Sequence, residues 1–238
     1  MEARDRAPSA LLRCLGRYAE LTGGDLDRLA DLAHRSRRWK AGAVLLAEGR
    51  AGGHFLLSGW ACRQRVLRDG RRQIFDVVAP GEGFGWGQAA DSPARQTVVA
   101  LTRVDIVEAG GLLIDGEQAV PGGLAKALRG LLLDEDARRL DHMVRLGRLT
   151  AVERVAHFVL EMQRRTGAAD PRSFPLPLTQ EVMADALGLS VVHLNRVLRH
   201  LRTSGLFELR RGVAHVLDRK ALVACAVLPV EAERAIGL

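Results

Sequence analysis

Cysteine is scarce in this sequence and irregularly spaced. The three cysteines, Cys14, Cys62 and Cys225, form no CxxC pair. A disulfide framework and a cysteine-held zinc site are therefore not expected. An iron–sulfur cluster is not expected either, because it needs about four cysteine ligands. Buried thiols in a reducing compartment are the simpler interpretation.

Long hydrophobic runs are also missing. The longest uninterrupted apolar stretch, 221–230, is far shorter than the roughly 20 residues that cross a bilayer. The first residues, MEARDRAPSALLRCLG, mix charges throughout and do not form a secretory signal. We therefore expect a cytoplasmic protein with no membrane partner.

Positive charge, by contrast, is in excess. The 238 residues include 35 Lys and Arg against 28 Asp and Glu, and the formal net charge of +7 comes almost wholly from arginine. This excess favours an anionic partner, either nucleic acid or a membrane surface. No GxSxG elbow, P-loop or HExxH motif is present, so we do not expect an enzyme.

The first half of the chain predicts a helix followed by a β-domain. Residues 22–38 place apolar side chains at helical spacing. Over residues 39–108, short apolar runs alternate with glycine-containing turns, one of which is the hairpin signal Asp69-Gly70. This pattern is typical of a compact antiparallel barrel or sandwich.

Helical periodicity returns over residues 121–147. This segment carries an apolar seam that suits a partner helix, so we expect it to dimerise. A helix packed on its own barrel is the alternative. The seam is interrupted by the acidic run 134–136, so no regular coiled coil is expected. The expected dimer contacts are Leu124, Leu128, Leu131, Leu140 and Val144.

The segment after this helix predicts a second, capped helix. Thr150 and Glu153 have the spacing of a capping box, and the helix they open should end near Gly167. Residues 168–177 contain prolines and predict a loop with a short strand.

The stretch LTQEVMADALGLSVVHLNRVLRHLRTSGLF, residues 178–207, predicts two helices around a tight turn. Thr179 caps the first helix, Gly188 stops it, and Ser190 caps the second. Two helices joined in this way form a helix-turn-helix unit, whose second helix fits the DNA major groove. The residues of the second helix expected to face inward are Leu194, Val197, Leu198 and Leu201.

Two short strands about Arg211-Gly212 are expected to follow as a wing. Residues 171–220 contain eight Lys or Arg against four Asp or Glu. More than half of the excess charge therefore lies in about a fifth of the chain. Attraction of such a segment to phosphates is independent of base sequence and sensitive to salt.

In this order, the parts of the chain resemble the Crp/Fnr family of bacterial transcription regulators. The most specific matching segments are LTQEVMADALGLSVVHLNRVLRHLRTSGL and RLTAVERVAHFVLEM. The segments WKAGAVLLAEG, HFLLSG, LRDGRRQI and APGEGFGW resemble the family's cyclic-nucleotide-binding-type fold. The resemblance covers the chain from about residue 20 to 225.

The resemblance implies an α+β fold, with a jelly-roll β-barrel, a long dimerisation helix and a C-terminal winged helix-turn-helix. The parts it predicts are an N-terminal extension (1–20), a sensor barrel (21–120), the dimerisation helix (121–147) and the DNA-binding domain (148–238).

The resemblance also implies DNA contacts. An arginine at position 196 can donate to O6 and N7 of guanine. Many relatives carry a glutamate where Val192 stands, so the operator sequence cannot be read from the family pattern. The implied base-reading residues are Val191, Val192, Asn195 and Arg196. The implied backbone contacts are Thr179, Gln180, Ser190, His193, Arg199 and Arg202.

An effector pocket is implied within residues 81–96, GEGFGWGQAADSPARQ. Cyclic-nucleotide binders of this fold hold the ribose with a glutamate and the phosphate with an Arg-Ser pair. Here Trp86 stands at the ribose position, and Arg95 and Gln96 correspond to the phosphate pair with a shift of one residue. We therefore do not expect cyclic AMP, and no cofactor is identified. A pocket without ligand and a different small molecule both remain open.

Together these features predict a sequence-specific transcription regulator, an activator that binds inverted-repeat promoter sites as a homodimer and contacts RNA polymerase. The alternative is a ligand-binding module that acts on a protein partner. A protein-docking helix would more often expose large apolar residues. Only Val191 and Val192 are apolar on the outer face of residues 191–202, which favours DNA.

Overall fold

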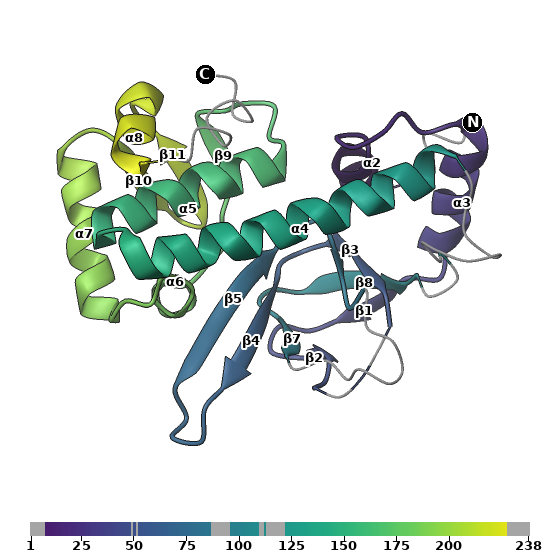
Figure 1. Cartoon of the computed structure of the whole chain (residues 1–238), viewed down its shortest axis with the longest axis horizontal. Helices are drawn as coiled ribbons and strands as arrows, with labels where there is room; N and C mark the ends of the chain where they lie inside the picture. The colour runs from purple at the N-terminus through teal and green to yellow at the C-terminus, as the bar shows by residue number, and fades with distance from the viewer. Residues whose placement is uncertain are drawn as a thin grey trace. The chain divides into compact units, whose positions relative to one another are not determined.

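The computed structural model describes residues 8–48, 50, 52–86, 96–109, 112 and 122–227. The chain divides into two compact units, Met1–Arg139 and Leu140–Leu238. The long helix α4 (Gly123–Arg148) contributes residues to both units (Figure 1). Helices and antiparallel sheets give the α+β fold expected from the sequence. No helix in the described part of the chain is long and apolar enough to span a membrane.

The first unit is built on two four-stranded antiparallel sheets, with the strand orders β1-β8-β3-β6 and β2-β7-β4-β5. Two facing sheets of this kind form the jelly-roll predicted for the sensor barrel. The strands are β1 (Arg37–Trp39), β2 (Val44–Leu46), β3 (His54–Ser58), β4 (Ala61–Val66), β5 (Arg72–Val78), β6 (Gly83–Phe84), β7 (Thr97–Ala100) and β8 (Val104–Glu108).

Strands β4 and β5 form the predicted hairpin, drawn as a long pair of arrows in Figure 1. Val66 pairs with Arg72 next to the turn. Gly70 lies in the turn with a φ of +84°, a conformation that a residue with a side chain rarely adopts. The Asp69-Gly70 signal therefore marked the turn correctly.

Successive side chains along a strand point to opposite faces of the sheet, and this alternation creates two apolar cores in this unit. Leu56 and Phe84 are fully buried in one cluster together with residues of both sheets. The neighbouring Phe55 lies in the other cluster, with residues of helices α2, α3 and α4. A strand with one apolar face toward the opposite sheet and the other toward helices is buried on both sides.

Helix α2 (Ser9–Leu15) was not expected, because the first 20 residues were interpreted only as an extension. Leu11 and Leu15 of this helix are fully buried in the core that contains Phe55. Burial raises the pKa of the Cys14 thiol to about 11, so this thiol stays protonated at neutral pH. The helix expected within residues 22–38 is α3 (Gly23–Ala33), capped by Thr22.

The predicted dimer seam on α4 is wrong for its first three members. Leu124, Leu128 and Leu131 are at most 2 % exposed and lie in the core of their own unit. Leu140 and Val144 are 60 % and 48 % exposed. The sequence pattern therefore joined two different helix faces into one seam.

The physical reason is a change of chemistry along the buried face of α4. After Leu131, this face continues through charged or polar residues that are also buried, namely Glu135, Arg138, His142 and Arg145. The apolar pattern instead moves to Leu133, which is 71 % exposed. Two positions on a helix correspond to a rotation of roughly 200°, so Leu133 lies nearly opposite Leu131.

The second unit combines helices with a three-stranded antiparallel sheet of order β10-β11-β9. Strands β10 and β11 form the expected wing, and Arg211 and Gly212 make its turn. The elements that follow α4 are α5 (Ala151–Thr166), β9 (Ser173–Pro175), α6 (Gln180–Leu187), α7 (Val191–Thr203), β10 (Phe207–Arg210), β11 (Val213–Val216) and α8 (Arg219–Ala226).

Helix α5 begins and ends as its sequence predicts. The side chains of Thr150 and Glu153 each accept a hydrogen bond from the other residue's backbone N–H, which completes the capping box. Gly167 ends the helix in the left-handed conformation, with a φ of +55°.

His157 is buried on helix α5, with 5 % of its surface exposed. Burial, reinforced by the positive charge of Arg145, lowers the pKa of this imidazole to about 4, although Glu161 acts in the opposite direction. The folded chain therefore holds His157 neutral at pH values where an unfolded chain would protonate it.

We expect the second unit to lose stability as the pH falls from about 6.5 to about 4. In this window the unfolded chain binds a proton at His157 and the folded chain does not, a difference of up to about 3 kcal/mol. Thermal unfolding of wild type and His157→Gln across this range tests the expectation. The Gln variant should lose less stability than wild type on acidification, and parallel curves would contradict the role of His157.

Candidate DNA-binding site

Helix α7 carries the site because its two faces differ in chemistry. Leu194, Val197 and Leu201 are buried, at most 4 % exposed, and hold the helix against its own unit. Arg196, Arg199 and Arg202 are exposed. Within the described residues, none of these three guanidinium groups makes an ion pair or a side-chain hydrogen bond. They are available to a partner of negative charge.

The turn between α6 and α7 follows the predicted pattern of caps. The Thr179 hydroxyl accepts a hydrogen bond from the N–H of Val182, and the Ser190 hydroxyl accepts one from the N–H of His193, each at 3.2 Å. Gly188 ends α6 in the left-handed conformation, with a φ of +62°. Each capping hydroxyl keeps its own hydrogen, which it can donate to a phosphate oxygen.

The first turn of α7 presents its residues to solvent. Val191 is 39 % exposed and Val192 is 71 % exposed. His193 and Arg196 are also exposed, whereas Asn195 is half-buried. Exposed valines beside arginine suit a surface that touches base edges, because a valine can contact the methyl group of thymine.

A cleft of about 410 Å³ brings four of the predicted contact residues together with the wing. Gln180, Asn195, Arg199 and Arg202 line it from the helices. Leu198, which was expected to face inward, is half-buried and lines the same cleft. The wing contributes Glu208, Leu209 and Arg210.

The wing residues were not predicted as site residues, although Arg210 and Arg211 contribute to the basic excess of residues 171–220. Arg210 donates to Glu208 across 2.8 Å at the edge of the cleft. Arg211, in the wing turn, has a φ of +49°, which is unusual for a residue with a side chain. Asn-Gly is the favoured pair for such a turn, so the arginine at its tip is held at a conformational cost.

Of the three predicted effector residues, the structure describes Trp86 and Gln96. Arg95 lies outside the described residues. The Trp86 ring packs against Phe55, with ring centroids 5.3 Å apart. A side chain at Gly53 or Gly83 would overlap the indole, so both glycines make room for it. A cleft of about 420 Å³ in this unit is lined by other residues, and neither Trp86 nor Gln96 borders it.

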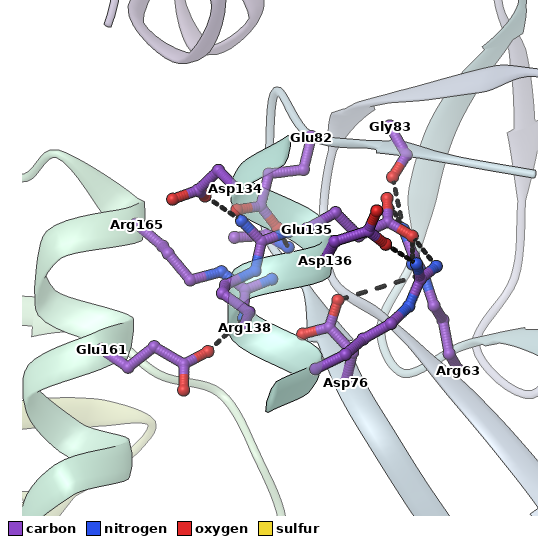
Figure 2. Close-up of polar contacts among 12 residues, drawn as sticks. Arg63, Asp76, Glu82, Gly83, Asp134, Glu135, Asp136, Arg138, Glu161 and Arg165 are labelled. Atoms are coloured by element: carbon purple, nitrogen blue, oxygen red, sulfur yellow. Dashed lines mark hydrogen bonds and ion pairs between the residues drawn. The ribbon is translucent and has the colours of Figure 1, made fainter. Parts of the chain in front are cut away.

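A charged cluster lies in the sensor unit beside strand β6 (Figure 2). Arg63 is fully buried and contacts Glu135 of α4. Burial acts to lower the pKa of Arg63, but the charge and hydrogen bonds of Glu135, together with the charge of Asp76, outweigh it, so the pKa of the guanidinium is raised. Sequence reasoning missed this pair, because a charged residue on a strand or helix is normally solvated.

Comparison with known proteins decides the family. Residues 153–225 match the family model described as a Crp-like helix-turn-helix domain, and residues 36–111 match the cyclic nucleotide-binding domain. The nitrogen fixation regulation protein FixK of Azorhizobium caulinodans is 31 % identical over 71 % of this chain and 69 % of its own length. The chain belongs to the Crp/Fnr family of transcription regulators.

Two further relatives agree with this assignment. The transcriptional activator protein FnrL of Cereibacter sphaeroides is 32 % identical, over 68 % of this chain and 66 % of its own length. The solved structure of FixK2 from Bradyrhizobium japonicum has a TM-score of 0.70 and 27 % identity, covering 82 % of this chain and 98 % of that one. The Crp/Fnr regulator is thus similar to these proteins along most of its length.

The wing turn yields a prediction in which stability and DNA affinity change in opposite directions. Replacing Arg211 by Asn should raise the free energy of unfolding by roughly 0.5–1 kcal/mol, because Asn suits the left-handed conformation. The same change should weaken DNA binding and reduce its dependence on salt, because a positive charge is lost. Chemical denaturation and fluorescence anisotropy at several salt concentrations measure the two effects.

Arg211→Lys is the matched control, since it keeps both the charge and the strained backbone. Its stability should equal that of wild type, and most of the affinity should remain. Unchanged affinity in the Asn variant would remove the wing turn from the DNA-binding surface.

Proposed function

We propose that this Crp/Fnr regulator is a homodimeric transcription activator that inserts helix α7 into the major groove of inverted-repeat promoter sites. One observation carries the proposal. The helix is held by a buried apolar face while its opposite face exposes Arg196, Arg199 and Arg202 without partners among the described residues. Phosphates and guanine edges are the DNA groups that arginine binds best.

The two ends of α7 serve different parts of DNA recognition. Arg196, with Val191 and Val192, lies in the first half of the helix and reads base edges. Asn195 can bind adenine from the same half. The second half, with Arg199 and Arg202, contacts phosphates and keeps the helix in register. The caps Thr179 and Ser190, with Gln180 and His193, add contacts to the DNA backbone.

Dimerisation through α4 supplies the symmetry that an inverted repeat requires. Leu133, Ala137, Leu140 and Val144 follow one another at intervals of four, three and four residues. All four are exposed in the single chain, and Met143 beside them is 61 % exposed. An apolar stripe with this spacing on a long helix suits a second copy of the same helix.

The effect of the bound dimer on transcription is proposed from its relatives. Transcriptional activators are prominent among them, including FnrL. A dimer of this kind reads two half-sites about one DNA turn, or ~34 Å, apart. We propose that it acts in the cytoplasm and activates transcription by contacting RNA polymerase at the promoter.

Arg196→Ala tests the assignment of the reading helix. The variant should lose the preference for its selected sites over random DNA, by about tenfold or more, because a bidentate arginine–guanine contact is worth about 1–3 kcal/mol. It should stay folded and dimeric, since Arg196 is exposed. Selection from a genomic fragment pool followed by gel-shift titration measures the preference.

Arg172→Ala is the matched control for this test. Arg172 is exposed in the same unit but lies outside the two helices of the motif. Its replacement should leave site preference intact. If Arg196→Ala selects the same sites as wild type, the role of Arg196 in reading bases is refuted.

Leu140→Glu tests the dimer stripe. A charge on each copy at this position should repel the other copy and remove apolar contact, so the dimer should dissociate at least about tenfold more readily. Sedimentation equilibrium measures the change. Leu217→Glu, at a position 53 % exposed in the second unit, is the control and should remain dimeric. A dimeric Leu140→Glu variant would move the interface elsewhere.

A further inference from the structure

The sensor unit buries a guanidinium group and supplies its counter-ion from its own helix. The Arg63 side chain on β4 is 2 % exposed, and the Glu135 side chain on α4 is 8 % exposed. Both terminal nitrogens of Arg63 contact the Glu135 carboxylate, and Nη2 lies 2.8 Å from Oε2. Figure 2 shows the two side chains pointing toward each other.

Arg63 has two further polar neighbours, although its buried Nε makes no hydrogen bond. Nη2 donates to the carbonyl oxygen of Gly83 at 2.8 Å, and Nε lies 3.9 Å from Oδ2 of Asp76. Glu135 also contacts Arg139, which is about half exposed. A buried guanidinium without a close carboxylate would be strongly unfavourable, because burial removes its hydration. Glu135 is therefore the group that makes this burial tolerable.

The Arg63–Glu135 pair lies near the place where a cyclic nucleotide-binding domain would hold its ligand. Gly83 belongs to β6, in the segment where the family resemblance places an effector. An unpaired guanidinium at this place could bind an anionic group of an effector. The Arg63 guanidinium, however, already donates to both carboxylate oxygens of Glu135 and to the backbone carbonyl of Gly83. Trp86 stands where a ribose-binding carboxylate would be needed. These residues do not fit a cyclic nucleotide.

We propose that Glu135 is a built-in anionic ligand of the sensor core. Its carboxylate occupies the place that an anionic effector would take on Arg63, and it comes from α4 rather than from solution. The attachment of α4 to the sensor sheets then needs no small molecule. The same geometry predicts a latent binding site, because removing the Glu135 side chain would leave a buried guanidinium that can accept a small carboxylate such as acetate.

Glu135→Ala with acetate rescue tests this inference. The atoms that the substitution removes beyond Cβ correspond to those of acetate. In chloride buffer, we expect the variant to unfold at least about 6 °C below wild type. Millimolar acetate should restore much of this loss, and chloride at equal ionic strength should not. Thermal unfolding is the readout, so the result does not depend on DNA binding.

Two variants show whether the rescue acts through Arg63. Asp136→Ala removes an exposed carboxylate from the same helix turn, and acetate should not change its unfolding temperature beyond the effect on wild type. Arg63→Met combined with Glu135→Ala removes the buried charge, and acetate should no longer rescue. Equal effects of acetate and chloride on Glu135→Ala would overturn the proposal.

Two more measurements keep the proposal testable if Glu135→Ala does not fold in chloride. Its recovery by refolding in acetate but not in chloride would support the latent site, and failure in both buffers would count against it. Glu135→Gln keeps the shape but not the charge, so wild-type stability of that variant would overturn the proposal. Calorimetry of wild type with cyclic AMP should show no binding, and micromolar binding would contradict the built-in ligand.

Discussion

A guanidinium group removed from water has to meet a carboxylate, and in the sensor unit this requirement links strand β4 to helix α4. Arg63 is buried on the strand and Glu135 is buried on the helix. The helix cannot turn about its axis or slide by one residue without separating the two charges in a medium that screens them poorly. The leucines one and two turns earlier on the same face add an apolar contact in the same orientation.

When the orientation of one face of α4 is set by buried contacts, the orientation of the opposite face is set as well. Because Glu135 and Leu131 point into the sensor unit, Leu133 and Ala137 must point away from it. The proposed dimer stripe depends on this separation, since a side chain cannot contribute to its own core and to a second copy at once. Helix α7 follows the same rule on a smaller scale, with leucines on the buried side and arginines on the exposed side.

Sequence patterns were reliable wherever local chemistry decides the structure. Thr150, Thr179 and Ser190 begin helices because their side chains satisfy backbone N–H groups within a few residues. Gly70 permits a turn that depends only on its own backbone freedom. The patterns failed on α4, where the buried face changes from leucine to charged residues. An apolar pattern cannot follow a face that is buried by ion pairing.

The sequence alone determined the order of the elements after residue 20, the helix-turn-helix with its caps, the wing and the excess of arginine on one helix face. These features depend on neighbours within about one helical turn or one hairpin. Only the tertiary structure decided that Arg63 meets Glu135, 72 residues further along the chain. It also decided that Leu131 faces its own core while Leu140 faces out. Both results depend on which surfaces meet in space, and a long-range pairing of charges leaves no periodic trace in the sequence.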